Sequence, residues 1–350
     1  MKLSGFAFNA LNDERLIAAR EKWFARLRNL FDGKYTDGNV FAVNGFTGIT
    51  PLGWLPFDQD ADPEFWVIES LEALSKSAGR IQNDVMFVPP CLECGPCGVH
   101  YIDKILGANV YYSAGQWYND YLKTPVGELE MPDVARNKTF LLSINAAKAF
   151  VKQNVKLPLY GLPTIASPLN IAVNLYGGEI LMEMLANPET AARDLRVITD
   201  VLKYIHTEFI KALPFGQLQP VLSFNRTQPP GYGQVCGCTT QLVSAETYKE
   251  MVAPLDEEIL NLYPHGGMIH LCGRHTQHIS TFRGMKSLRS VQLNDAAAKD
   301  LEVYFKELRK DQIIYLNPCA DMPIDKAMEI TKGERLVIAD TISNPLPRNL

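Results

Sequence analysis

The sequence predicts an α/β protein that forms a single (β/α)8 TIM barrel domain over residues 1–350, with a helical extension at the N-terminus. Segments with helical periodicity alternate with short apolar runs, and such runs are typical of strands buried on both faces of a helix-covered parallel sheet. No Gly/Ser-rich linker or charge block divides the chain. A doubly wound open sheet is the structural alternative, but no Gly-x-Gly-x-x-Gly follows an early strand to support it.

Three helices have clear start signals. Asn12 or Asp13 can cap a helix whose apolar positions recur at steps of three and four residues through Phe31. Asp62-Pro63-Glu64 places a capping carboxylate before a proline at the first helical position, and Gly79 is predicted to end that helix. Asn187-Pro188-Glu189 repeats the signal ahead of an apolar face that continues to Leu213. Weaker helical patterns cover Ser244 to Tyr263, Arg274 to Met285, Asp295 to Lys310 and Pro323 to Thr331.

Eight apolar runs between the helices are predicted to be the barrel strands. They are Val40–Val43, Val85–Val88, Leu157–Leu162, Val221–Phe224, Met268–Cys272, Ser290–Leu293, Ile313–Leu316 and Leu336–Ala339. From residue 265 onward the alternation of strand and helix is regular, which favours repeated β/α units.

Composition and charge exclude several classes of protein. With 47% hydrophobic and 21% charged residues the chain can bury a large core, and a net charge of −5 without a long basic run argues against a nucleic-acid partner. Charged residues occur soon after the N-terminus, a pattern that is unlike a secretory signal. The uncharged stretch Leu157 to Gly178 is interrupted by prolines and asparagines, which argues against a membrane helix. We therefore expect a cytoplasmic protein with no membrane segment, and the odd count of seven cysteines indicates reduced thiols rather than a disulfide framework.

The most informative residues follow predicted strands, because the C-terminal ends of the strands carry the chemistry of a TIM barrel. His270 and Cys272 stand two apart at the end of one strand, so their side chains share a face and can reach one metal ion. Cys319 follows the strand Ile313–Leu316 and can supply a third ligand. A His/Cys/Cys set with an open fourth position is typical of catalytic zinc, whereas the alternative is a half-buried histidine with two free cysteines that pack as small hydrophobic residues.

Two further cysteine groups allow several interpretations. Cys236-Gly-Cys238 can join the same site from the neighbouring strand, form a redox pair, or pack within a loop. The run Cys91-x-x-Cys94-x-x-Cys97-x-x-His100 has the first spacings of an iron–sulfur motif but lacks its fourth cysteine, so we interpret it as a structural Gly/Pro-rich loop.

The other histidines and the missing motifs narrow the chemistry. His206 lies within a predicted helix and is interpreted as structural. His275 and His278 follow the strand of His270 at three-residue spacing, and His278 has the better-buried surroundings for a supporting role. The chain contains no Gly-x-Ser-x-Gly, no Gly-x-x-x-x-Gly-Lys-Ser/Thr and no His-Glu-x-x-His, so the usual hydrolase and nucleotide-binding signatures are lacking.

Three groups of short patterns stand between residues 150 and 340. They are Gly161-Leu-Pro-Thr-Ile-Ala-Ser167 followed by Asn187-Pro-Glu189, Ser244-Ala-Glu-Thr-Tyr248 with Val252-Ala-Pro254, and Ile269-His-Leu-Cys-Gly273. On these patterns the chain resembles the uroporphyrinogen decarboxylase superfamily, including its cobalamin-dependent (corrinoid) methyltransferase branch. The family fold is a (β/α)8 barrel. The arginine-rich N-terminal segment of the decarboxylases has no counterpart between Met1 and Trp54.

The resemblance implies a zinc-dependent methyltransferase-like enzyme that acts with a corrinoid protein or on a small methylated substrate. His270 and Cys272 match the family's zinc-binding pair. The family's later cysteine follows the last strand, where this chain has Asp340, so Cys319, Cys238 or Asp340 can each complete the set, and we predict Cys319. Glu246 and His278 are the predicted polar helpers in catalysis.

Two alternatives belong to other classes. A metal-free lyase of the decarboxylase type acting on a small carboxylate needs cationic groups at the mouth of the barrel, for which Arg226, Arg274 and Arg283 are the candidates. A non-catalytic barrel that binds a small molecule would keep the pocket without turnover.

Overall fold

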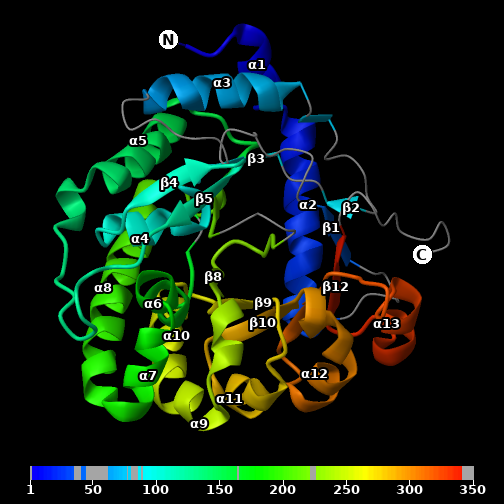
Figure 1. Ribbon diagram of the computed structural model, residues 1–350. Helices are drawn as coiled ribbons and strands as arrows, with labels where there is room; N and C mark the ends of the chain where they lie inside the picture. The colour runs from blue at the N-terminus through cyan, green and yellow to red at the C-terminus, as the bar shows by residue number, and fades with distance from the viewer. Residues whose placement is uncertain are drawn as a thin grey trace.

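A computed structural model describes residues 2–34, 41–44, 62–76, 78–79, 86–87, 90–163, 165–220 and 226–340 of the chain. It is a mixed α/β structure in which parallel sheets are surrounded by many helices (Figure 1). Among these residues, no helix has the length and apolar character needed to cross a membrane.

The main sheet has seven parallel strands in the order β2-β1-β12-β11-β10-β9-β8. Their bounds are β1 (Phe41–Asn44), β2 (Met86–Phe87), β8 (Gly233–Cys236), β9 (Gly267–Leu271), β10 (Leu288–Leu293), β11 (Ile313–Leu316) and β12 (Leu336–Asp340). A second parallel sheet has three strands in the order β3-β6-β7, with bounds β3 (Cys91–Glu93), β6 (Leu159–Gly161) and β7 (Leu218–Gln219). An antiparallel hairpin, β4 (Val110–Ser113) and β5 (Gln116–Asn119), stands apart from both.

The two parallel sheets approach each other where the chain leaves β6. Ala166 forms an isolated parallel bridge with Cys236 of β8, and the Ser167 N–H donates to the Cys236 carbonyl at 2.8 Å. Strand pairing within the described residues does not join the sheets into a ring, and the predicted strand Val221–Phe224 lies outside those residues. The closed barrel therefore stays a prediction.

The helices before β9 are α1 (Gly5–Ala10), α2 (Glu14–Phe31), α3 (Pro63–Ser75), α4 (Tyr101–Ile105), α5 (Lys138–Lys152), α6 (Pro168–Tyr176), α7 (Gly178–Ala186), α8 (Pro188–Ala212), α9 (Ala245–Thr247) and α10 (Ala253–Leu260). Those after β9 are α11 (Ile279–Gly284), α12 (Leu301–Glu307) and α13 (Ile324–Thr331), and in the view of Figure 1 α9, α11 and α12 lie in a row below β9 and β10.

The predicted starts of the three clear helices are confirmed. The Asp13 side chain accepts a hydrogen bond from the Arg15 N–H at the start of α2, and Asp62 caps α3 through the Glu64 N–H with Pro63 in the first turn. Helix α8 begins at Pro188 as predicted, but the Asn187 side chain does not cap it, because its amide donates to the Glu183 carboxylate instead. The weaker patterns give broken helices: Ser244 to Tyr263 contains α9, a π-helical turn at Tyr248–Val252 and α10.

The sequence patterns did not predict three of the parallel strands, β3, β7 and β8. β3 and β8 are short and contain Glu93 and Gln234, so neither is a continuous apolar run. Their burial comes from the surrounding structure, because Glu93 is 4% exposed and Gln234 is completely buried. A single apolar cluster extends from Leu11 to Ile338 and packs the sheets against the helices.

Candidate metal centre

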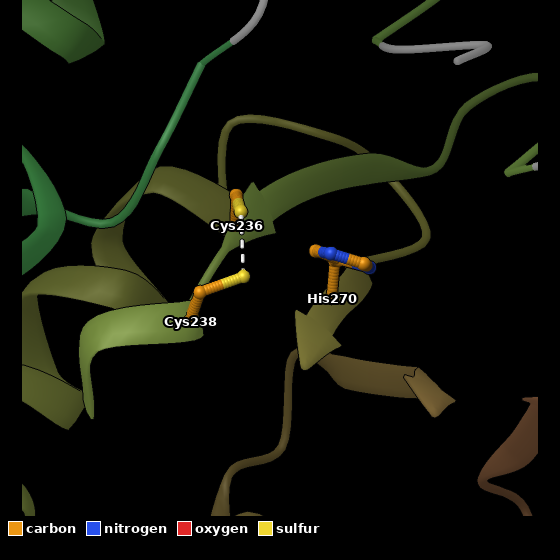
Figure 2. A group of neighbouring side chains, drawn as sticks. All are labelled: Cys236, Cys238 and His270. Carbon is orange, nitrogen blue, oxygen red and sulfur yellow. Dashed lines mark hydrogen bonds between the residues drawn. The ribbon is translucent and has the colours of Figure 1, made fainter. Parts of the chain in front are cut away.

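Two neighbouring parallel strands end in a cluster of sulfur and nitrogen donors. Cys236 is the last residue of β8 and lies opposite His270 of β9 in the strand register. Cys238 follows at the start of a 3₁₀ turn, Cys238–Leu242, and Cys272 comes directly after β9. Figure 2 shows the side chains of Cys236, Cys238 and His270 converging from these two strand ends.

The donor atoms lie close enough to share one metal ion. The Sγ atom of Cys272 is 2.9 Å from His270 Nε2 and 3.1 Å from Cys238 Sγ, and Cys238 Sγ is 3.4 Å from Cys236 Sγ. The ligand atoms of Cys236, Cys238 and His270 all fall within 4.8 Å of one another. Ligands of a tetrahedral zinc ion stand about 3.5–3.8 Å apart for zinc–sulfur bonds of ~2.3 Å and zinc–nitrogen bonds of ~2.0–2.1 Å. We call Cys236, Cys238, His270 and Cys272 the donor group. Small side-chain movements suffice for Cys236, Cys238 and His270 to hold a metal ion, and Cys272 lies beside two of them.

A hydrogen-bond chain sets the tautomer of His270. Gln292 on the adjacent strand β10 places its Oε1 atom 2.7 Å from His270 Nδ1, and its Nε2 atom donates to Asn317 Oδ1 at 2.7 Å. Because a carboxamide oxygen can only accept, Nδ1 carries the proton and Nε2 keeps its lone pair. Burial lowers the pKa of His270 well below its ordinary value, and the charge of Arg226 adds to the effect, so the ring is neutral. A neutral imidazole held in this way is the form that binds a metal.

Contacts from α6 hold the turn that carries Cys236 and Cys238. The Oδ1 atom of Asn170 accepts hydrogen bonds from the backbone N–H and the hydroxyl of Thr239, and its Nδ2 atom lies 3.9 Å from Cys236 Sγ. The Gly237 N–H donates to the His270 carbonyl at 2.8 Å. Both strand ends are thereby fixed relative to each other before any ion is bound.

Cys238 lies between the other two thiols and can donate its one proton to either of them. The hydrogen bond from Cys238 is the main cause that lowers the pKa of Cys236 to about 6, and the Arg226 charge contributes while burial opposes it. The hydrogen bond from Cys238 also lowers the pKa of Cys272. These same two bonds, together with burial, raise the pKa of Cys238. The donor group therefore favours a thiolate at Cys236 beside the protonated thiol of Cys238, and the Cys272 thiol can donate to the unprotonated Nε2 atom of His270.

The structure places the other predicted site residues as follows. Cys319 is half-buried after β11, where its backbone forms a bridge with Met322, and it does not belong to the donor group as defined within the described residues. The side chain of Asp340 lies outside those residues. Glu246 is exposed in α9, on the surface of the molecule. The third ligand and the role of Glu246 thus stay predictions.

His278 and His275 contact backbone carbonyls of the turn that carries Cys238. The Nε2 atom of His278 lies 2.9 Å from the Thr240 carbonyl, and the ring packs against Tyr248 at 4.4 Å between centroids. Burial lowers the pKa of His278 to about 4, so the neutral ring donates to this carbonyl. His275 is completely buried, with Nδ1 at 2.7 Å from the Gly273 carbonyl and Nε2 at 3.1 Å from the Gly237 carbonyl. In these positions both histidines contact the backbone around the donor group.

The second cysteine run has a different environment. Cys91, Cys94 and Cys97 are all buried, and burial raises the pKa of each thiol, that of Cys94 to about 12. His100 does not complete the run as a ligand, because its Nδ1 atom pairs with Asp103 Oδ2 at 2.6 Å. Asn174 donates to the same Asp103 oxygen at 2.9 Å.

Sequence reasoning left Cys236 and Cys238 as one of several possibilities and missed Gln292 and Asn170. Cys236 ends strand β8 and Cys238 begins the turn that follows it, and the apolar pattern of the sequence did not predict that strand. Gln292 could have been found, since it is a polar residue inside a predicted strand adjacent to the one that carries His270.

Comparison with solved structures finds a similar fold in a methyltransferase from Methanosarcina mazei. The TM-score is 0.60 at 14% sequence identity, and the match covers 93% of this chain and 94% of that chain. No protein-family model matches the sequence, and no curated protein matches it. The likeness concerns the fold of nearly the whole chain.

Proposed function

We propose that this chain is a zinc-dependent methyltransferase-like enzyme that moves a methyl group between a small substrate or thiol acceptor and a corrinoid protein. The observation that carries the proposal is the neutral, oriented Nε2 atom of His270 beside the thiol of Cys272 and the neighbouring pair Cys236 and Cys238. The fold similarity to a methyltransferase supports the reaction class. Membership of the uroporphyrinogen decarboxylase superfamily and closure of the sheets into a single-domain barrel are parts of the same proposal.

In this proposal His270, Cys236 and Cys272 would hold the zinc ion, with the Cys238 thiol beside them. Catalytic zinc keeps three protein ligands and one exchangeable position. We assign Cys238 to the exchangeable position, since its pKa is raised and its proton is shared with both neighbours, whereas the pKa values of Cys236 and Cys272 are lowered. Cys319, the third ligand predicted from the sequence, is replaced in this assignment by Cys236.

Zinc bound here would lower the pKa of a coordinated thiol and so make it a nucleophile toward a methyl group. The protein's own residues prepare the site for this step. Gln292 keeps the His270 proton on Nδ1, and the Arg226 charge favours thiolates at Cys236 and Cys272. His278 acts on the reaction only through the turn that carries Cys238, and we therefore propose it as a positioning residue.

The test is the zinc content of protein purified without chelator. We expect about one zinc ion per chain in the wild type, little zinc in the variant with both His270→Ala and Cys272→Ala, and an unchanged zinc content in the matched variant Cys91→Ala. Zinc absent from the wild type, or retained after the double substitution, would falsify the proposal. Thioether formation from free methylcobalamin and a thiol, which should require zinc, tests the methyl transfer itself.

One observation favours a metal-free lyase as the second candidate. Arg226 is 5% exposed, and its charge acts on Cys236, Cys272 and His270, so a cation lies near the donor group. Arg274 and Arg283, the other arginines considered, are exposed. In this alternative a small carboxylate raises the thermal midpoint of the chelator-treated protein and zinc does not.

A further inference from the structure

An unsatisfied glutamine lies on β8 next to the donor group. Gln234 is completely buried, and neither its Oε1 nor its Nε2 atom has a hydrogen-bond partner in the part of the chain that the structure describes. The Oγ1 atom of Thr227, also completely buried, is unpartnered in the same part. Buried polar atoms without partners are costly and rare, so these atoms point to a group that binds there.

The strand register places Gln234 on the same face as the metal donors. A Cβ atom on Gly233 would collide with the ring of Tyr263, so Gly233 faces outward under that ring. Successive residues of a strand alternate between faces, and Gln234 and Cys236 therefore both face the other way. Cys236 lies opposite His270, which extends this face onto β9. Residues two apart on a strand stand roughly 6.5–7 Å apart.

Neighbouring buried glutamines show that the unsatisfied amide is exceptional. Gln228 donates to the Gly233 carbonyl at 2.8 Å and accepts from the Ser290 hydroxyl at 3.0 Å. Gln219 exchanges two hydrogen bonds with the backbone of Gln228. The amides of Gln228 and Gln219 thus already have partners, and either could serve Gln234 only by giving up a hydrogen bond.

We propose that Gln234 binds the amide-type group of a small neutral ligand whose other end reaches the donor group. The inference rests on the proposed function, because it treats the donor group as the reactive end of the site. The backbone positions of Gln234 and Cys236 are roughly 6.5–7 Å apart along the strand, so one small molecule can contact both side chains.

The unpartnered Oε1 and Nε2 atoms of Gln234 favour an amide over a carboxylate as the bound group. A carboxamide side chain offers both a donor and an acceptor, and a second amide satisfies both at once. A carboxylate accepts only, so it would leave the Oε1 atom of Gln234 facing another oxygen. A charged group would also have to give up its hydration in a position where Gln234 has no exposed surface.

Acetamide and acetate are the probes for this inference. In protein as purified, we expect acetamide at tens of millimolar to raise the thermal midpoint of the wild type by about 1–3 °C more than that of Gln234→Met, and acetate to have no such effect. Gln312→Met is the matched control. Gln312 is equally buried but its amide donates to the Phe282 and Leu288 carbonyls, so this variant should have a lower midpoint and keep the acetamide response.

Three results would overturn the inference: equal acetamide shifts in the wild type and Gln234→Met, a larger shift with acetate than with acetamide, or a midpoint for probe-free Gln234→Met as low as that of Gln312→Met. The last would mean that the amide of Gln234 already has partners in the ligand-free protein. Gln234→Leu, which also removes the amide, should reduce the shift in the same way and serves if Gln234→Met does not fold. Zinc content measured on the same samples tests the proposed function separately, because neither variant removes a metal donor.

Discussion

The two cysteine groups of this chain contain the same side chain in opposite chemical states. Cys91, Cys94 and Cys97 are buried in the core cluster, and burial raises the pKa of every one of them. Cys236 and Cys272 have lowered pKa values although burial opposes the shift, because a neighbouring thiol donates to each.

The difference comes from the neighbours rather than from burial alone. Low-dielectric surroundings disfavour a thiolate unless hydrogen-bond donors or positive charge compensate for the lost hydration. The donor group has both, in the Cys238 thiol and in Arg226. The Cys91 group instead has the carboxylate of Glu93, whose charge raises the pKa values of Cys91 and Cys94 further. The spacing of the cysteines in the sequence does not reveal which charged or hydrogen-bonding groups surround them.

Alkylation of the metal-free protein should give the largest contrast between the groups. At pH 7, a pKa of about 6 leaves Cys236 about nine-tenths thiolate, whereas a pKa of about 12 leaves Cys94 about one part in 10⁵. We expect iodoacetamide to modify Cys236 at least ~10³ times faster, as measured by peptide mass mapping over time. Since the thiolate exists above the pKa, the rate at Cys236 should rise through about pH 6 and level off above pH 7.

The control for alkylation is the same protein loaded with zinc, in which Cys236 should be protected and Cys94 unchanged. Comparable rates at the two cysteines in the metal-free protein would contradict the contrast and would mean that the donor group is structural packing.

Much of the fold could be predicted because it depends on local signals. The caps at Asp13 and Asp62 and the apolar runs at β9 to β12 specify their elements within a few residues. β8 could not be predicted in this way, since Gly233 and Gln234 give it no apolar pattern and its burial comes from β9 and from the ring of Tyr263.

The candidate site, like the fold, could be predicted only where it depends on local sequence. His270 and Cys272 share one strand end, so the period of a strand alone predicts that they face the same way. Cys236 and Cys238 join them through the pairing of β8 with β9, which is a contact between segments more than thirty residues apart. The orientation of His270 depends on Gln292 from a third strand, and no local pattern contains that information.

Substitution of Gln292 sharpens the comparison by leaving every thiol in place. Gln292→Leu removes the acceptor at His270 Nδ1 and frees the ring to rotate or to change tautomer. We expect the zinc affinity to fall by about 10- to 100-fold, measured by competition with a chromogenic chelator. Gln312→Leu removes another buried glutamine far along the chain from the donors and should leave the affinity unchanged. An equal loss in both variants would indicate general destabilisation instead.

The smallest expected effect compares alanine with serine at one cysteine of each group. Cys91 is 1% exposed, so a serine hydroxyl there loses hydration, and Cys91→Ser should lower the free energy of unfolding by about 1 kcal/mol more than Cys91→Ala. Cys238 lies within hydrogen-bond distance of two neighbouring sulfurs and can donate its one proton to either, a role that a hydroxyl can take over and a methyl group cannot. In the metal-free protein at pH 7 we therefore expect the reverse order there, with Cys238→Ser the more stable variant by about 1 kcal/mol in urea denaturation. If alanine were the better replacement at both positions, Cys238 would be a small hydrophobic residue like Cys91, and its proton would not be the cause of the lowered pKa values on either side.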